Sequence, residues 1–220
     1  MAIPTIFKAS SYNGPTVYNN GGGDDIQEEE INGIKYKVIN ANGKIWLAEN
    51  LKYTDSNLVL NGNGDEKGYY YPNGDINNVE KYGYLYNLEA ALYISSNIAG
   101  WHLANRTEWR NLADWIGCNN RNISGYYLKS KKEEWIDDPS TKTNIDIIDF
   151  SVLPAGSCSM NFATPPTITY NSFNLYAFFW TTTVYSSGTN WYSQFEYNDN
   201  RYIDSYNGGN LGYSLRLVKD

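Results

Sequence analysis

The residue types that most often act as bases, nucleophiles or metal ligands are scarce in this chain of 220 residues. It contains one histidine, His102, and two cysteines, Cys118 and Cys158. Two cysteines are too few for a disulfide framework or a structural zinc site, although they leave one bridge open. Histidine is the commonest general base, but His102 precedes a predicted helix, so we expect it to make structural hydrogen bonds instead.

Carboxylates offer one arrangement that could do acid–base chemistry. Asp137 and Asp138 are adjacent, and Asp146 and Asp149 are three positions apart. Some enzymes that cleave glycosidic bonds use paired carboxylates, but such separations are common in loop-like sequence and specify no geometry. We therefore expect no catalytic residues and no enzymatic activity.

Alternating oxygen-bearing side chains begin a loop that partly matches a calcium site. Asn61, Asn63 and Asp65 alternate as the first three ligands of an EF-hand loop do. The next positions depart from that pattern, because Glu66 stands where glycine is required and Pro72 stands where the bidentate glutamate belongs. A solvated loop is the better interpretation, and the sequence predicts no metal and no cofactor.

The residues best suited to molecular recognition are concentrated between positions 185 and 210, where Tyr, Ser, Asn and Gly predominate. Tyrosine provides a large contact area with little side-chain entropy to lose, and Ser, Gly and Asn provide adaptable hydrogen bonds. Tyr-rich strands that merely cover a sheet surface are the alternative. We expect the ligand contacts to come from Tyr185, Ser187, Asn190, Tyr192, Gln194, Glu196, Asn198, Asn200, Tyr202, Asp204, Tyr206, Asn207 and Asn210.

Side-chain alternation predicts which of these residues face solvent. Trp191 and Phe195 are large and separated by an even number of positions, so both are expected in the core. The intervening and flanking residues should then point to solvent, namely Asn190, Tyr192, Gln194 and Glu196. A turn at 198–200 would lead into a next strand that carries Tyr202, Asp204 and Tyr206. The closing segment 213–218 alternates similarly, which predicts a strand with one buried face.

The elements that must position this segment are a hairpin, two helices and later short strands. Residues 34–39 alternate and residues 44–47 follow an Asn42-Gly43 pair, which predicts a hairpin. Residues 86–94 are helix formers with one apolar face. Past residue 139 the pattern changes to short β-type runs, so the fold class is α+β with helices early and strands late.

The second helix has the stronger signals. Asn105 followed by Glu108 matches a capping box, and Gly117 stands where a left-handed residue often ends a helix. A core-facing stripe at helical spacing runs between them, formed by Trp109, Leu112, Ala113 and Ile116.

The length and net charge of the chain limit how many domains it can form and which partners it can bind. With 41% hydrophobic residues the chain can bury one sizeable core, which we place at residues 31–220. Residues 1–30 read as a flexible arm, either a tether to a larger assembly or a disordered leader. The net charge of −7 argues against a nucleic-acid partner. No run approaches the ~18 apolar residues of a membrane helix, and the start lacks a secretory signal, so we expect no membrane insertion.

Six phrases in a fixed order resemble one family. They occupy residues 43–51, 82–86, 100–103, 107–109, 179–183 and 213–220. Together they resemble the Fibrobacter succinogenes major paralogous domain, from about residue 33 to the end. That family is similar to C-type-lectin-fold proteins, including variable proteins of diversity-generating retroelements. The resemblance implies a C-type-lectin-like fold of two early helices and twisted antiparallel strands with long loops.

The resemblance also narrows the function. The calcium-ligating motifs of sugar-binding C-type lectins are missing, and so are the late paired cysteines of formylglycine-generating relatives. The variable proteins instead imply a non-enzymatic protein whose Tyr/Asn/Ser-rich surface binds a protein or glycan on a target cell. Such residue types would also follow from adenine-directed mutation of Asn codons.

That reading places the protein in a virion, associated with a phage tail, or less favourably on a bacterial cell surface. The alternative function is a structural or adhesive surface domain without variable positions. Homo-oligomerisation through the arm or through a larger assembly stays open.

Overall fold

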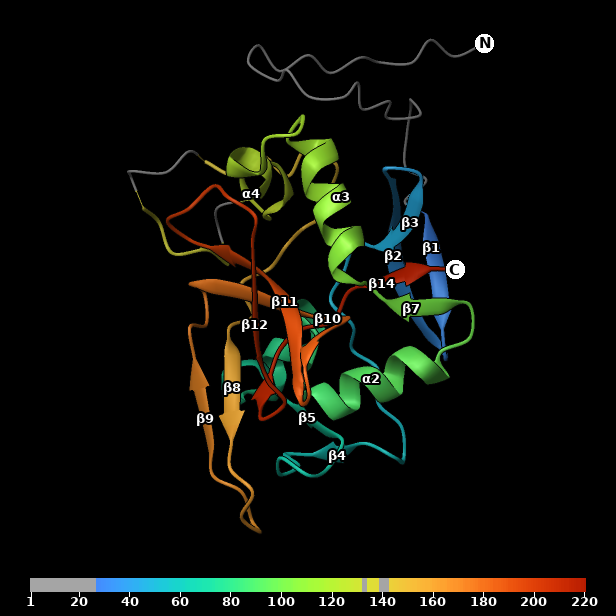
Figure 1. Cartoon of the computed structure of the whole chain (residues 1–220), viewed down its shortest axis with the longest axis vertical. Coiled ribbons are helices and arrows are strands. Elements are labelled where there is room, and N and C mark those ends of the chain that lie inside the picture. Colours follow the sequence, from blue (N-terminus) through green and yellow to red (C-terminus); the bar gives the residue numbers. More distant parts are fainter. Residues whose placement is uncertain (1–26, 132–133, 139–142) are drawn as a thin grey trace.

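The structure is a computed structural model that describes residues 27–131, 134–138 and 143–220. It is α+β, as expected, with short helices and several small, mostly antiparallel sheets (Figure 1). A five-stranded sheet lies at the right of Figure 1, and the β8–β9 hairpin extends downward at the left. No helix in these ranges is long and apolar enough to span a membrane.

Four α-helices occur in the described part of the chain: α1 (Val79–Tyr82), α2 (Leu88–Asn97), α3 (Arg106–Ile116) and α4 (Ser124–Leu128). The strands over the same residues are β1 (Glu28–Ile31), β2 (Ile34–Ala41), β3 (Lys44–Leu47), β4 (Val59–Leu60), β5 (Gly68–Tyr70), β6 (Leu85–Tyr86), β7 (Trp101–Leu103), β8 (Ser157–Met160), β9 (Ile168–Asn171), β10 (Tyr176–Ser186), β11 (Thr189–Glu196), β12 (Ile203–Gly208), β13 (Leu211–Gly212) and β14 (Leu217–Lys219).

The predicted hairpin is confirmed as β2 and β3, which pair antiparallel around Asn42 and Gly43. Both turn residues have positive φ, 53° and 74°, the conformation in which an Asn-Gly pair matches the twist of the strands.

Residues 28–30, which were predicted to belong to the arm, lie in a strand instead. Glu28, Glu29 and Glu30 form β1 and pair with β2, where Glu28 lies opposite Lys37 and Glu30 opposite Lys35. Opposite charges across an antiparallel pair stabilise the strand, which explains why an acidic run is not part of the arm. The remainder of the predicted arm, residues 1–26, lies outside the described residues.

The five-stranded sheet has the order β1-β2-β3-β14-β7, so the last strand of the chain lies between two early ones. Val218 of β14 pairs with Trp46 of β3 and with His102 of β7. The sheet therefore joins segments from both ends of the domain.

The start of helix α3 matches the sequence prediction, but the residues that end the helix differ from it. Asn105 accepts from the Glu108 backbone, and the Glu108 side chain accepts from the Asn105 backbone, which confirms the capping box. Gly117 is not left-handed, since its φ is −88°, and Cys118 and Asn119 take the positive φ values instead. Glycine is needed there for space, because an added Cβ would lie 2.6 Å from the hydroxyl of Ser124.

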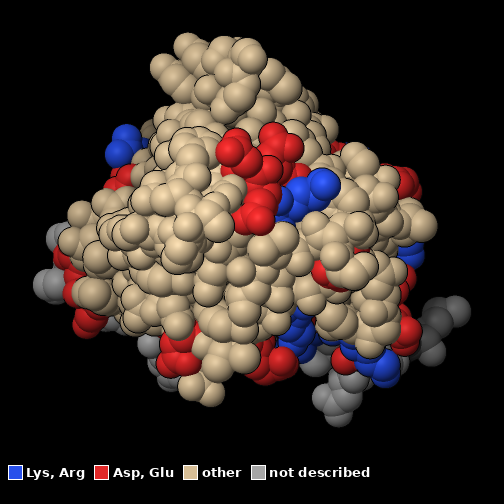
Figure 2. All heavy atoms as spheres, turned by 90° about the horizontal axis from the view of Figure 1, so that it is seen from below, with Lys and Arg blue, Asp and Glu red and all other residues tan. Residues whose placement is uncertain are grey.

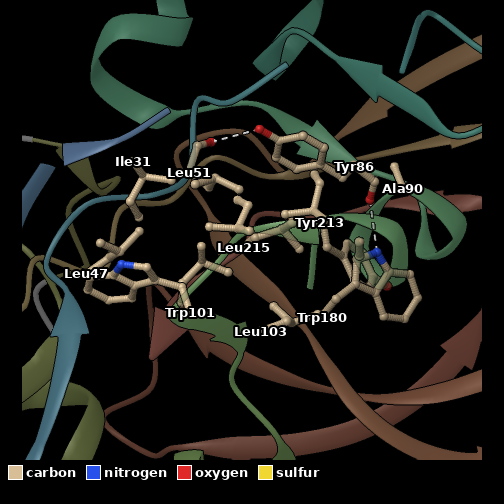
Figure 3. Close-up of a cluster of buried hydrophobic side chains, with 14 of the residues drawn as sticks. Ile31, Leu47, Leu51, Tyr86, Ala90, Trp101, Leu103, Trp180, Tyr213 and Leu215 are labelled. Carbon is tan, nitrogen blue, oxygen red and sulfur yellow. Dashed lines mark hydrogen bonds between the residues drawn. The ribbon is translucent and has the colours of Figure 1, made fainter. Parts of the chain in front are cut away.

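The sheet β10-β11-β12 is covered on both faces. On one face the indole of Trp109, from α3, packs on Phe179 and Phe195 with ring centroids 5.0 and 6.0 Å apart. On the other face Trp180 and Tyr192 pack with the ring of Tyr213. The second group belongs to the core cluster in Figure 3, where the Trp180 indole donates to the carbonyl oxygen of Tyr86.

The closing segment departs from its predicted alternation. Residues 213–218 are all buried, so both faces are covered rather than one. Arg216 is fully buried, and its guanidinium donates to Asn50 Oδ1 and to the carbonyl oxygens of Leu47, Phe150 and Ser151. Burial lowers the pKa of the guanidinium, and the Asp146 carboxylate opposes that shift.

Candidate ligand-binding site

Strand β11 departs from the solvent-facing pattern predicted for it. Asn190 and Tyr192 are buried, and Asn190 donates to the carbonyl oxygen of Thr181. Phe195 is buried as expected, but Trp191 is only half-buried. Trp191 and Phe195 do share a face. Helix α3 covers that face at Phe195, whereas at Trp191 the aromatic ring lies beside the first turn of the helix.

Tyr202 is also buried, which removes it from the predicted contact surface. Its hydroxyl lies 3.1 Å from Ser193 Oγ, and burial raises the pKa of that hydroxyl. Its ring packs edge-on against Phe195. Tyr202 therefore closes the core beneath the turn that joins β11 to β12.

The remaining predicted residues separate toward opposite ends of the sheet. Asn198 and Asn200 lie in the turn after β11, where the Asn200 carbonyl accepts from the Gly125 backbone. Gln194 and Glu196, both half-buried, bond to each other near that end. The residues toward the other end are Tyr185, Ser187, Tyr206, Asn207 and Asn210, all of them exposed. At ~3.3 Å per residue, the two ends are roughly 20 Å apart, so one small ligand cannot contact both.

Three rings gather at the end of the sheet where β10 turns into β11, and we call them the aromatic tip: Tyr185, Trp191 and Tyr206. Tyr185 and Tyr206 stack with centroids 3.6 Å apart and planes 5° from parallel. Trp191 meets both rings edge-on with centroids 5.5 Å away. Tyr185 is 48% exposed and Tyr206 is 46% exposed, although large aromatic side chains usually bury most of their surface.

Arg106, which the sequence analysis did not identify, supports the aromatic tip. Its guanidinium carbon lies 3.2 Å from the centroid of the Trp191 ring, a cation–π contact. The same guanidinium bonds to Asp204, and the Arg106 backbone N–H donates to Thr183 Oγ1. One sequence signal could have pointed to Arg106. Arg106 and Arg110 are four residues apart, so they share a helix face on which one acidic side chain could bond to both.

Asp204 is consequently a scaffold residue rather than an available ligand contact. It accepts from Arg106 and from Arg110, whose Nε lies 2.9 Å from Oδ2. Burial alone would raise the pKa of Asp204, but the hydrogen bonds from the two arginines outweigh it, and the pKa lies below its ordinary value. The carboxylate therefore remains ionised and offsets one of the two positive charges that it contacts.

Strand β10 is irregular where it reaches the aromatic tip. The pairing with β11 shifts register between Trp180 and Val184, and again between Val184 and Ser186. Val184 is 65% exposed as a result. Bulges of this kind are frequent near functional sites, because they redirect side chains at the end of a sheet.

Comparison with known families supports the family resemblance that the six sequence phrases suggested. The Fibrobacter succinogenes major domain matches residues 39–219, which is most of the chain. This chain belongs to that family. No curated protein and no solved structure matched the sequence. The match covers α3 and the whole β10-β11-β12 sheet, so the aromatic tip lies within the family domain.

In this member of the Fibrobacter succinogenes major domain family, charge is absent from a long part of the sequence beside the aromatic tip. Residues 150–195 contain no Lys, Arg, His, Asp or Glu. They include the β8–β9 hairpin, β10 and nearly all of β11. Seen from below, toward the end where that hairpin extends, the molecule shows a broad face with few charged side chains apart from one mixed group near its middle (Figure 2).

The groups that could do acid–base or metal chemistry lie apart from the aromatic tip. His102 contacts Asp220 through Nδ1 (2.6 Å) and Glu108 through Nε2 (2.9 Å), which confirms a structural hydrogen-bonding role. Asp146 is buried and accepts from the backbone and hydroxyl of Ser151. Among the described residues, no three His, Cys, Asp or Glu side chains are grouped so that they could hold a metal ion.

The His102 contacts predict a pH-dependent contribution to stability. Burial would lower the pKa of His102, but the hydrogen bonds to Glu108 and Asp220 outweigh it, so the pKa lies above its ordinary value. The contribution is therefore fully present below the unfolded pKa of about 6.5, and it is lost as the pH rises through the higher folded pKa. We expect His102→Gln to cost about 1 kcal/mol at pH 6 and less at pH 9, measured by urea unfolding. An equal loss at both pH values would contradict the charged pairing.

Proposed function

We propose that this chain is a non-enzymatic ligand-binding protein that contacts its ligand through the aromatic tip. The observation that carries the proposal is the stacked Tyr185–Tyr206 pair, which is half exposed and braced by Trp191. Exposed aromatic clusters commonly mark interaction sites, and tyrosines make good general-purpose contacts. The support beneath them is rigid, since three paired strands and an ion-paired helix hold the rings.

We further propose a C-type-lectin-like fold. Three features support it: the closing strand β14 inserted beside β3, the two longer helices α2 and α3, and a separate antiparallel sheet that carries the site. The proposed role is that of a variable protein of a diversity-generating retroelement. Substitutions should then concentrate at the exposed predicted positions, namely Tyr185, Ser187, Asn198, Tyr206, Asn207 and Asn210, and should spare the buried Asn190, Tyr192 and Tyr202.

The proposed setting is a phage tail, where the aromatic tip would contact a protein or glycan on a target cell, with the bacterial surface as the second setting. A fixed adhesive domain is the alternative function. Sequencing the gene across a natural population separates the two, because an adhesive domain would show variation spread evenly over its surface.

Binding is tested with the labelled full chain and a panel of intact bacterial cells, read by flow cytometry. We expect the Tyr185→Ala/Tyr206→Ala double variant to bind at least about tenfold more weakly than the wild-type chain, because aromatic residues at the centre of a patch dominate affinity. Phe162→Ala is the matched control, since Phe162 is an exposed aromatic on the separate β8–β9 hairpin. Equal binding by the double variant and the wild type, or no binding to any cell, would contradict the proposed function.

A further inference from the structure

The aromatic tip has the size and the flat ring surfaces of a site for a sugar ring. We propose that its ligand is an uncharged saccharide, bound by stacking on the exposed tyrosine faces without a metal ion. This inference rests on the proposed function and specifies the class of ligand. Four features of the structure carry it.

The first feature is the shape of the tyrosine pair. The two rings are nearly parallel and their centroids lie 3.6 Å apart, so each ring covers one face of the other. Tyr185 is 48% exposed and Tyr206 is 46% exposed, so both keep surface that a ligand can contact. One face of a pyranose presents a patch of C–H groups about as wide as a phenol ring. Stacking that patch on tyrosine removes apolar surface of both partners from water.

The second feature is that the rings are already held in place. Trp191 lies directly opposite Tyr206 across the β11–β12 pair and touches both tyrosines. A hydrogen bond between the tyrosines raises the pKa of the Tyr185 hydroxyl, and Arg106 covers the Trp191 ring. A weakly interacting ligand such as a sugar gains most from a preformed site, because little side-chain entropy is lost on binding.

The third feature is the absence of an available charge. Arg106 is the cation in contact with the aromatic tip, and its guanidinium is committed to Trp191 and Asp204. Asp204 is in turn shared with Arg110. Two guanidinium groups share this one carboxylate, so the group keeps one net positive charge, but both guanidinium groups already bond to Asp204. The stacked tyrosine rings themselves carry no charge, so we expect them to favour a neutral ligand. The charge-free run 150–195 includes Tyr185 and Trp191.

The fourth feature is the small number of polar groups at the site. Ser187 is exposed two positions after Tyr185. Asn207 is exposed next to Tyr206 in sequence, but its side chain accepts from the Gly208 backbone and bonds to Tyr213. The serine and tyrosine hydroxyls can bond to sugar hydroxyls. Three rings with a few polar neighbours are small beside the ~20–30 residues per partner of a standard protein interface, which favours a saccharide over a protein surface.

The deciding experiment extends the cell-binding assay. Cells that bind the wild-type chain are treated either with periodate, which cleaves vicinal diols of sugars, or with protease. We expect periodate to reduce binding at least tenfold, whatever the effect of protease. Binding that depends on Tyr185 and Tyr206 but survives periodate would overturn the saccharide assignment and leave the proposed function intact. Binding that does not depend on the tyrosines would overturn the proposed function itself.

A second measurement uses defined probes with the same full chain. Neutral hexasaccharides of glucose, mannose, xylose and N-acetylglucosamine are titrated and followed by calorimetry, with a uronic-acid hexasaccharide as the charged comparison. At least one neutral probe should bind, and Tyr206→Ala should weaken it at least tenfold, whereas Phe162→Ala should not. The assignment is wrong if the acidic probe binds more tightly than every neutral one, if the Tyr206→Ala and Phe162→Ala variants bind alike, or if no probe binds.

Discussion

Replacing Arg216 with methionine is expected to cost the protein about 3–5 kcal/mol of its free energy of unfolding. The guanidinium is fully buried and satisfies Asn50 together with three backbone carbonyl groups. Methionine fills much of the same volume but donates no hydrogen bond, so those acceptors would be left buried without a partner. The buried Asp146 carboxylate would also lose its nearest compensating charge.

Urea unfolding of Arg216→Met and Arg110→Met provides the measurement. Arg110 is a half-exposed arginine that bonds to Asp204, and exposed ion pairs contribute only about 0–1 kcal/mol. The two variants remove the same chemical group, so their difference isolates the effect of burial. A loss below about 1 kcal/mol for Arg216→Met would show that the carbonyl groups find water or other donors.

Truncating Trp180 to alanine is the second change with a large expected effect, about 3–5 kcal/mol. The indole is fully buried, its ring centroid lies 4.5 Å from that of Tyr213, and its nitrogen donates to the Tyr86 carbonyl at 2.9 Å (Figure 3). The alanine variant would leave a cavity between β10 and the segment after β13, and it would leave the carbonyl without that donor.

Trp191→Ala is the matched control for Trp180→Ala, because both remove an indole from neighbouring strands of one sheet. Trp191 is half-buried against Arg106, so we expect a loss of about 1–2 kcal/mol in stability. Thermal and urea unfolding measure both variants. We expect the opposite order for ligand binding. Among the molecules that remain folded, Trp191→Ala should weaken ligand binding more than Trp180→Ala does. A greater loss of stability for Trp191→Ala would mean that the aromatic tip is part of the core.

Local signals predicted the parts of the fold that depend on neighbouring residues. The Asn42-Gly43 turn and the Asn105–Glu108 capping box are each complete within a few positions, so their structures follow from sequence. The family phrases predicted the domain match. In contrast, the acidic strand at Glu28 depends on lysines that lie across the strand pair, and composition alone could not reveal it.

The sequence mispredicted which side chains of β11 are exposed. Alternation correctly places Trp191 and Phe195 on one face of β11, but it does not say how far α3 extends over that face. The helix covers Phe195 and leaves Trp191 beside its first turn, while the opposite face packs Tyr192 into a second core cluster. Arg106 could not be identified for the same reason, since its partners Trp191 and Asp204 are distant in sequence.

The insertion of β14 between β3 and β7 has a consequence for how the protein is made. Arg216 and Asn50 bond across 166 positions of sequence, and the five-stranded sheet has a gap until β14 arrives. During synthesis the early strands and both longer helices leave the ribosome well before the strand that joins them. Long-range pairing of this kind slows folding, because a large loop must close before the contacts form. The local β2–β3 hairpin can therefore form before the five-stranded sheet that contains it is complete.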